Sequence, residues 1–170
     1  MTSAPVGLST SAWWLEKGVI LHDNKYLVAE DRKTYMCEKA RILVIFFGSY
    51  RNRSTKHFVK YLNKLYSYTT EKRARLEIIF IPQDEDEADC EFFVKALMGD
   101  WLIVPWSNQQ LRRKVKNMYS VSDQPWLVVV KNDAKGSLVR LDGKSDLLDY
   151  GYFCWRDWME IAKEIPPPES

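Results

Sequence analysis

The sequence predicts an α/β fold with a central mixed sheet and helices on both of its faces. Two continuous apolar runs, residues 40–47 and 75–82, are typical of strands that are buried on both faces of a parallel sheet. A helix-spaced segment lies between them, which predicts a right-handed strand–helix–strand crossover. Two later strand-like runs, residues 125–132 and 137–143, are separated by a short turn and predict an antiparallel hairpin.

The length and composition favour one globular domain with short extensions. We expect a flexible N-terminal segment over residues 1–12, a folded domain over residues 13–165 and a tail over residues 166–170 of the 170-residue chain. Hydrophobic residues make up 46% of the chain, so a sizeable core can be buried. The net charge of +2 argues against a protein built mainly to hold a nucleic-acid backbone.

The cysteines and the N-terminus bear on the cellular compartment. Cys37, Cys90 and Cys154 are odd in number and widely spaced, and this pattern predicts neither a disulfide scaffold nor a zinc site. We expect Cys90 and Cys154 to be small apolar core residues with reduced thiols. The chain lacks a signal-peptide pattern and an apolar run of membrane-spanning length. The sequence therefore predicts an intracellular protein, cytoplasmic or nuclear, without membrane contact.

Two segments in the first half of the chain have clear local patterns. Residues 18–31 read as a strand, a turn at an Asp-Asn pair and a second strand. Residues 54–69 carry apolar side chains at positions i, i+4, i+7 and i+8, which indicate one buried face of a helix. Ser54 or Thr55 is the expected N-cap of that helix, because its side-chain oxygen can accept a free backbone N–H.

The second half predicts three more helices and a connector. A segment that starts acidic and turns amphipathic predicts a helix from about residue 87 to 98, with carboxylates at its positive end. Residues 101–106 form an apolar connector, which a proline marks as a loop or a sheet edge. Residues 107–119 are helix-spaced and begin with Ser107 or Asn108 as a cap. A last amphipathic helix over residues 153–165 ends at three prolines.

Six strings occur along the chain in a recognisable order and spacing between about residues 15 and 163. They are ILVIFFGSYRNRS, IIFIPQDEDEADCEFF, WLIVPW, VSDQPWLVVV, LVRLDG and YFCW. Together they resemble the tryparedoxin and nucleoredoxin branch of the thioredoxin fold. In that branch a buried strand runs into a Trp-Cys-Pro-Pro-Cys loop that opens a helix, and a later segment carries a cis proline. The resemblance implies a thioredoxin-like fold.

The chain departs from that family at the loop which carries its chemistry. In register, Tyr50 stands in place of the tryptophan, Arg51 and Ser54 in place of the two cysteines, and Asn52 and Arg53 in place of the prolines. Thiol–disulfide exchange needs one thiolate to attack and a second thiol to resolve the mixed disulfide. Arginine and serine supply neither. The resemblance therefore implies the fold, whereas these residues predict that the chain is not an enzyme.

Two interpretations of the loop remain open. It is either a surface turn left by a decayed site or a binding site at a helix N-terminus, where free N–H groups and the helix dipole favour an anion. Arg51 and Arg53 lie at this positive end and are repelled by about 0.3–1 kcal/mol each. Their presence there indicates an acidic partner, or nearby carboxylates such as those of residues 84–87.

The cis proline of the family corresponds to Pro125. By resemblance, Pro125 is cis and lies beside residues 50–54, and in active relatives the backbone just before this proline pairs with an extended substrate peptide. The physical basis is strand addition, in which free backbone groups take up an added chain. This groove needs no cysteine, so peptide binding can outlive catalysis. The candidate binding surface is therefore Tyr50, Arg51, Asn52, Arg53, Ser54, Gln124 and Pro125.

A second candidate surface lies near the N-terminus. Trp13 and Trp14 precede the first predicted strand and have no obvious duty in the core. They either cover a hydrophobic edge of this chain or anchor a partner, since tryptophan is enriched among the residues that dominate interface energetics.

The sequence thus predicts a catalytically inactive, thioredoxin-like binding or scaffold module. We expect protein partners, such as an acidic or an extended peptide segment, and no cofactor or metal. One alternative is a thiol–disulfide oxidoreductase that uses a displaced cysteine. Another is a module that binds an anion or RNA through Arg51, Arg53, Lys56 and the basic helix face at residues 111–116.

Overall fold

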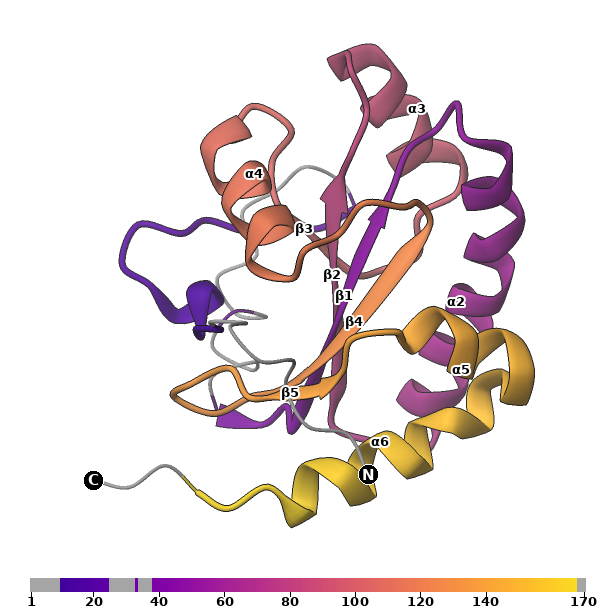
Figure 1. The fold of residues 1–170 in the computed structure, drawn as a ribbon. Coiled ribbons are helices and arrows are strands. Elements are labelled where there is room, and N and C mark those ends of the chain that lie inside the picture. The colour runs from indigo at the N-terminus through magenta and orange to yellow at the C-terminus, as the bar shows by residue number, and fades with distance from the viewer. Residues whose placement is uncertain (1–9, 25–32, 34–37, 168–170) are drawn as a thin grey trace.

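A five-stranded mixed sheet lies at the centre of the computed structural model, which describes residues 10–24, 33 and 38–167 (Figure 1). The strand order is β3-β2-β1-β4-β5. The strands are β1 (Ile42–Gly48), β2 (Leu76–Pro82), β3 (Leu102–Ile103), β4 (Trp126–Lys131) and β5 (Leu138–Arg140). β1 pairs in parallel with β2 and antiparallel with β4, and β4 pairs antiparallel with β5. The predicted mixed sheet and its C-terminal hairpin are confirmed.

Helices cover both faces of this sheet, as predicted (Figure 1). They are α2 (Arg53–Glu71), α3 (Glu87–Ala96), α4 (Gln109–Met118), α5 (Gly143–Tyr150) and α6 (Cys154–Glu164), with short 3-10 turns η1 (Trp13–Leu15) and η2 (Gly151–Phe153). Side chains of α2, α3, α5 and α6 pack against one face, and those of α4 and η1 pack against the other.

β1 is buried along its whole length because both of its faces meet a packed layer. Successive side chains of a strand point to opposite faces. Phe46 and its alternate neighbours therefore join the cluster under α2, whereas Phe47 and its alternate neighbours join the cluster under α4. This two-sided burial explains why the strand reads as a continuous apolar run.

The start of α2 differs from the prediction. Asn52 is the N-cap, and its Oδ1 accepts the Thr55 N–H at 2.8 Å. The helix begins at Arg53, earlier than the apolar spacing indicates, so Ser54 and Thr55 lie inside the first turn and the expected cap was wrong. The cap of α4 is Asn108, one of the two expected residues.

Other differences fall at segments with weak patterns. The helix α5 was not predicted, because its sequence GKSDLLDY carries few apolar residues and follows a strand directly. Of the hairpin predicted over residues 18–31, the described part contains an isolated bridge between His22 and Ile103, and the second strand lies outside the described residues. Most of the N-terminal segment, part of the C-terminal tail and Cys37 also lie outside them.

The two N-terminal tryptophans are core residues. Trp13 and Trp14 are fully buried and pack on the face of the sheet that α4 covers. The Trp13 Nε1–H donates to the Tyr119 hydroxyl at 3.0 Å, and the Trp14 Nε1–H donates to Asn132 Oδ1 at 2.9 Å. Of the two alternatives for this pair, the structure favours covering the sheet. The surface-anchor interpretation was wrong because neither side chain reaches the surface.

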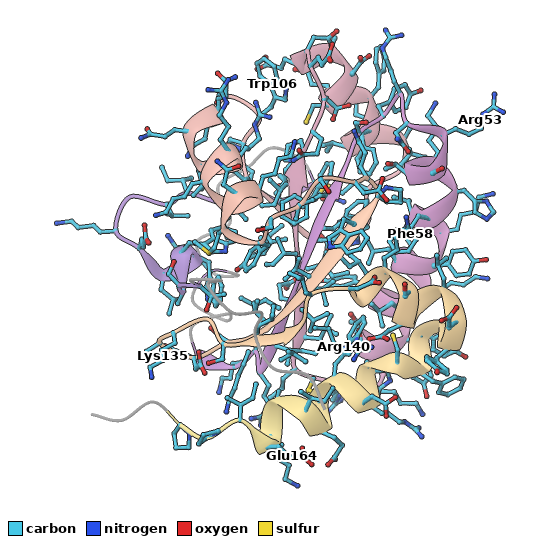
Figure 2. The ribbon with its side chains drawn as sticks, in the orientation of Figure 1. Arg53, Phe58, Trp106, Lys135, Arg140 and Glu164 are labelled. Carbon is cyan, nitrogen blue, oxygen red and sulfur yellow. The ribbon has the colours of Figure 1, made fainter. Side chains whose placement is uncertain are left out.

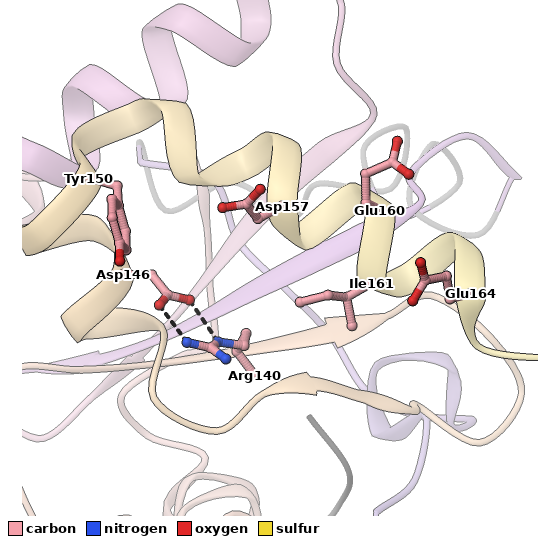
Figure 3. Close-up of a pocket in the computed structure, with 7 residues that line it drawn as sticks. All are labelled: Arg140, Asp146, Tyr150, Asp157, Glu160, Ile161 and Glu164. Carbon is pink, nitrogen blue, oxygen red and sulfur yellow. Dashed lines mark hydrogen bonds and ion pairs between the residues drawn. The ribbon is translucent and has the colours of Figure 1, made fainter. Parts of the chain in front are cut away.

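A buried carboxylate joins β5, α5 and α6. Asp146 accepts two hydrogen bonds from the Arg140 guanidinium, at 2.8 and 2.6 Å (Figure 3). It accepts a third from the Trp158 Nε1–H at 2.8 Å. Trp158 is fully buried, so its N–H has no access to water. The carboxylate therefore satisfies a buried donor and a cation at once.

Replacing Asp146 with asparagine is expected to lower the free energy of unfolding by about 1.5 kcal/mol, because one acceptor and the charge opposite Arg140 are lost. Urea denaturation of the two proteins measures the difference. Asp149→Asn, a change of the same charge at an exposed position of the same helix, is the matched control and should change stability by less than about 0.5 kcal/mol. Equal effects of the two substitutions would contradict this assignment.

Candidate binding site at the carboxyl end of the sheet

The loop after β1 and the loop after β2 meet at one edge of the sheet. β1 and β2 are parallel and in register, with Gly48 opposite Pro82. The segments that follow these two residues therefore start side by side. The backbone N–H of Tyr50 donates to Asp84 Oδ1 at 2.7 Å, which ties the first loop to the second.

The segment before β4 closes the other side of the site. The Gln124–Pro125 peptide bond is cis, as the resemblance implied. The Ser49 hydroxyl donates to Gln124 Oε1 at 2.7 Å. The cis proline therefore lies beside the loop after β1, and the predicted adjacency is confirmed. We call residues 49–54, Gln124 and Pro125 the loop face.

The predicted residues of the loop do not converge on one point. Arg51 forms an ion pair with Asp89 of α3, with Nε 2.6 Å from Oδ2. Asn52 is used as the helix cap. Arg53 and Ser54 are exposed in the first turn of α2, and the Arg53 side chain points away from the fold (Figure 2). Arg51 is therefore the loop arginine that contributes to a cavity.

An aromatic pair lies beside this ion pair. The Tyr50 ring lies 5.7 Å from the ring of Phe92 on α3, measured between centroids. The Lys56 ammonium lies 4.1 Å from the Tyr50 ring centroid. Phe92 is 56% exposed, although it is a large apolar residue. Exposed aromatic side chains next to a cavity are typical of interaction surfaces.

A cavity of about 350 Å³ opens between the loops. It is lined by Ser49, Arg51, Gln83, Asp84, Glu85, Asp86, Asp89 and Gln124. Four carboxyl groups and one guanidinium face this space, and the guanidinium already pairs with Asp89. Of the two explanations offered for the loop arginines, an acidic partner or nearby carboxylates, this charge balance favours the carboxylates.

Asp84 is the least exposed of these carboxyl groups. The residue is 5% exposed, and its Oδ1 is occupied by the Tyr50 N–H. Its Oδ2 is buried and has no hydrogen-bond partner within the part of the chain that the structure describes. Burial raises the pKa of Asp84 above its usual value, and the nearby Asp89 carboxyl adds to the rise.

This environment predicts that Asp84→Asn stabilises the protein at pH 7. Asparagine keeps an acceptor for the Tyr50 N–H but cannot ionise. Because the pKa of Asp84 is raised in the native state, the folded protein keeps the Asp84 proton to a higher pH than the unfolded chain does. The free energy of unfolding therefore falls as the pH rises through the raised pKa. The gain from the substitution should therefore shrink as the pH falls toward about 3.9, the ordinary value for aspartate.

Urea denaturation of Asp84→Asn and of the unaltered protein, at several pH values between about 3.9 and 7, measures the gain in stability. Glu91→Gln, an exposed change of the same charge on α3, is the control and should change stability by less than about 0.5 kcal/mol. A loss of more than about 1 kcal/mol in Asp84→Asn at pH 7 would show that Oδ2 has a protein partner.

A neighbouring pocket of about 380 Å³ shares Asp84 and contains Arg112. The Arg112 guanidinium donates to the carbonyls of Trp106, at 2.9 Å, and Pro82, at 3.1 Å. Burial lowers the pKa of Arg112. This half-buried arginine therefore contacts the end of β2. Its hydrogen bonds to the two carbonyls separate it from the basic face expected at residues 111–116.

The described cysteines are core residues, as predicted. Cys90 and Cys154 are buried and form no disulfide. Burial raises the pKa of Cys154 to about 12, so its thiol stays protonated at neutral pH.

Sequence reasoning missed the residues that shape the cavity. Asp89, Phe92 and Ser49 were not singled out, and Asp84 was considered only as one of several carboxylates near the loop arginines. The parallel arrangement of β1 and β2 was the available signal, because it brings residues 49–51 and 83–86 to the same edge. The predicted start of α3 at residue 87 is confirmed, but the pairing of Arg51 with Asp89 depends on how α3 packs beside the loop, which the sequence does not give.

Comparison with known proteins agrees with this architecture. A family model described as thioredoxin-like matches residues 40–136. Nucleoredoxin-like protein 1 of Homo sapiens is 28% identical over 130 residues, which is 74% of this chain and 60% of that protein. The chain thus spans about three fifths of the length of this curated relative.

Solved structures show the same fold. Thioredoxin from Wuchereria bancrofti superposes with a TM-score of 0.68 and 22% identity, over 84% of this chain and 94% of that one. Tryparedoxin I from Leishmania major superposes with a TM-score of 0.67 and 20% identity, over 94% of this chain and 98% of that one. Separately, none of the helices in the described residues has the length and apolar character needed to cross a bilayer.

Proposed function

The chain belongs to the thioredoxin-like family, and we propose that it is a member without thiol chemistry which binds protein partners through the loop face. In active relatives this face carries the two cysteines of the Cys-Pro-Pro-Cys loop. In the register that the resemblance gives, Arg51 and Ser54 take those places in this chain. A cytoplasmic or nuclear location remains part of this proposal.

One observation carries the proposal: the loop and the cis proline remain joined although the thiols are absent. The Ser49–Gln124 hydrogen bond, at 2.7 Å, holds the two segments together. The Gln124 N–H donates to the exposed Asp123 carboxylate at 2.9 Å. An extended peptide beside residue 124 can exchange that solvent-exposed contact for a backbone hydrogen bond, as in strand addition.

The aromatic pair supplies an apolar contact for the same partner. Phe92 presents more than half of its surface to solvent next to Tyr50. Burial of an exposed aromatic ring is a common source of binding free energy at interfaces. A peptide that lies across the loop face can cover this ring.

The absence of catalysis is tested by reduction of insulin disulfides with dithiothreitol as the electron source. We expect the rate with this protein to equal the rate without it, because the loop carries no thiol and Cys90 and Cys154 are buried. A thioredoxin serves as the positive control. Turnover that disappears in Cys37→Ser, Cys90→Ser or Cys154→Ser would instead establish an oxidoreductase with a displaced cysteine.

Binding is tested by amide chemical-shift mapping of the ¹⁵N-labelled protein with a pool of blocked, extended decapeptides. We expect shifts at residues 49–54 and 124–126. Phe92→Ala should weaken binding about tenfold, whereas Phe153→Ala, which removes a similarly exposed ring near α6, should not. Shifts that avoid the loop face, or equal effects of the two alanine variants, would contradict the proposed function.

A further inference from the structure

The cavity beside the loop face contains a buried acceptor without a donor. Among the described residues, Asp84 Oδ2 has no hydrogen-bond partner although the residue is 5% exposed. A buried carboxylate oxygen without a partner is costly, and native proteins normally satisfy such groups with a protein group, water or a ligand. The cavity that Asp84 lines is large enough for a ligand group, since 350 Å³ falls in the usual range of about 300–1,000 Å³.

Side-chain donors that line this cavity or the neighbouring pocket bond to other acceptors. The Gln83 amide donates to the carbonyls of Ile81, at 3.1 Å, and Pro82, at 3.2 Å. Arg112 donates to backbone carbonyls at the end of β2, and Arg51 pairs with Asp89. Each of these donors already has its own acceptor. Within the described residues none of these donors reaches Oδ2, and Asp84 itself lines the cavity.

The charge of the cavity selects the kind of group that fits. Among the described residues, Asp84, Glu85, Asp86 and Asp89 line it, with Arg51 as the one cation. A cationic group would gain attraction from several carboxylates and would satisfy the open acceptor. A neutral donor would gain only the hydrogen bond, and an anion would be repelled.

We propose that the cavity receives an arginine side chain of the bound peptide, with its guanidinium donating to Asp84 Oδ2. This inference rests on the proposed function, because the peptide lies on the loop face. Ser49 and Gln124 line the cavity and also belong to that face, so a residue beside position 124 can direct its side chain inward. Arginine suits the site because its planar group carries five donors, enough to reach Asp84 and a second carboxylate.

A second acidic pocket on α6 serves as an internal comparison. It is lined by Arg140, Asp146, Tyr150, Asp157, Glu160, Ile161 and Glu164 (Figure 3). Its buried carboxylate, Asp146, is paired with Arg140 and Trp158 through both oxygens. Both pockets are acidic. They differ because both carboxylate oxygens of Asp146 are paired, whereas among the described residues Asp84 Oδ2 has no hydrogen-bond partner.

The experiment uses three blocked heptapeptides of glycine and serine that differ only at the central residue, which is arginine, citrulline or glutamate. Citrulline has the shape of arginine but no charge. Dissociation constants are measured by fluorescence anisotropy at low salt, and the contact site is mapped by amide shifts. We expect the arginine peptide to bind about tenfold or more tightly than the citrulline peptide, and the glutamate peptide to bind most weakly.

The variant Asp84→Asn should reduce the affinity for the arginine peptide about tenfold, to the level of the citrulline peptide, while Glu91→Gln should leave it unchanged. The comparison of the arginine peptide with the citrulline peptide uses the unaltered protein, so it does not depend on whether a variant folds. Equal affinities of these two peptides, with shifts at the loop face, would overturn the arginine assignment and leave the proposed function standing. Shifts absent from the loop face with every peptide would overturn both.

Discussion

Replacing Trp13 with alanine is expected to lower the free energy of unfolding by about 3–5 kcal/mol. The Trp13 ring is fully buried and packs edge-on against Trp14, with centroids 5.6 Å apart and planes at 86°. Its N–H is also the donor to the Tyr119 hydroxyl, which is itself buried. The substitution therefore opens a cavity beneath α4 and removes a buried hydrogen bond.

Urea denaturation measures this loss, and the exposed neighbour Leu15 provides the control. Leu15→Ala should change stability by less than about 0.5 kcal/mol, because its side chain is 41% exposed. If Trp13→Ala costs less than about 1 kcal/mol, the N-terminal segment does not cover the sheet, and the tryptophan pair becomes available again as a partner surface.

Introducing Arg51→Cys together with Ser54→Cys is expected to convert the protein from no turnover to measurable insulin reduction. Residue 51 precedes the cap of α2 and residue 54 lies in its first turn. A thiol in such a place usually has its pKa lowered from about 8.5 to between about 3.5 and 7.5. The two thiols can then attack a disulfide and resolve the mixed intermediate.

The carboxylate of Asp89 affects how fast the double variant reduces insulin. Once Arg51 is replaced, Asp89 loses its partner and its negative charge raises the pKa of the nearby thiol. Adding Asp89→Asn should therefore increase the reduction rate further at pH 7. The variant with Ser54→Cys alone is the control, since one thiol can form a mixed disulfide but cannot resolve it. If the folded double variant forms no disulfide between residues 51 and 54, the register of the loop is wrong.

The central part of the fold was predictable because it depends on hydrophobic burial. β1 and β2 are buried on both faces, so their sequences read as continuous apolar runs. The α2 segment carries its apolar side chains on one face. The cis peptide at Pro125 came from the family resemblance and not from the residues themselves.

What the sequence could not supply depends on contacts between distant segments. Trp13 precedes every predicted strand, and only the folded chain shows that it packs beneath α4. The loop arginines left two explanations open, an acidic partner or nearby carboxylates such as those of residues 84–87. The carboxylate that pairs with Arg51 is that of Asp89 on α3, which lies 38 residues away. Whether a charged loop attracts anions or cations is decided by that tertiary arrangement.

The most direct measurement is a crystal structure of the protein with the arginine heptapeptide. We predict that the peptide backbone lies beside Gln124 and that the guanidinium is within about 3 Å of Asp84 Oδ2. A peptide seated in the acidic pocket on α6, or one whose arginine avoids Asp84, would contradict this account.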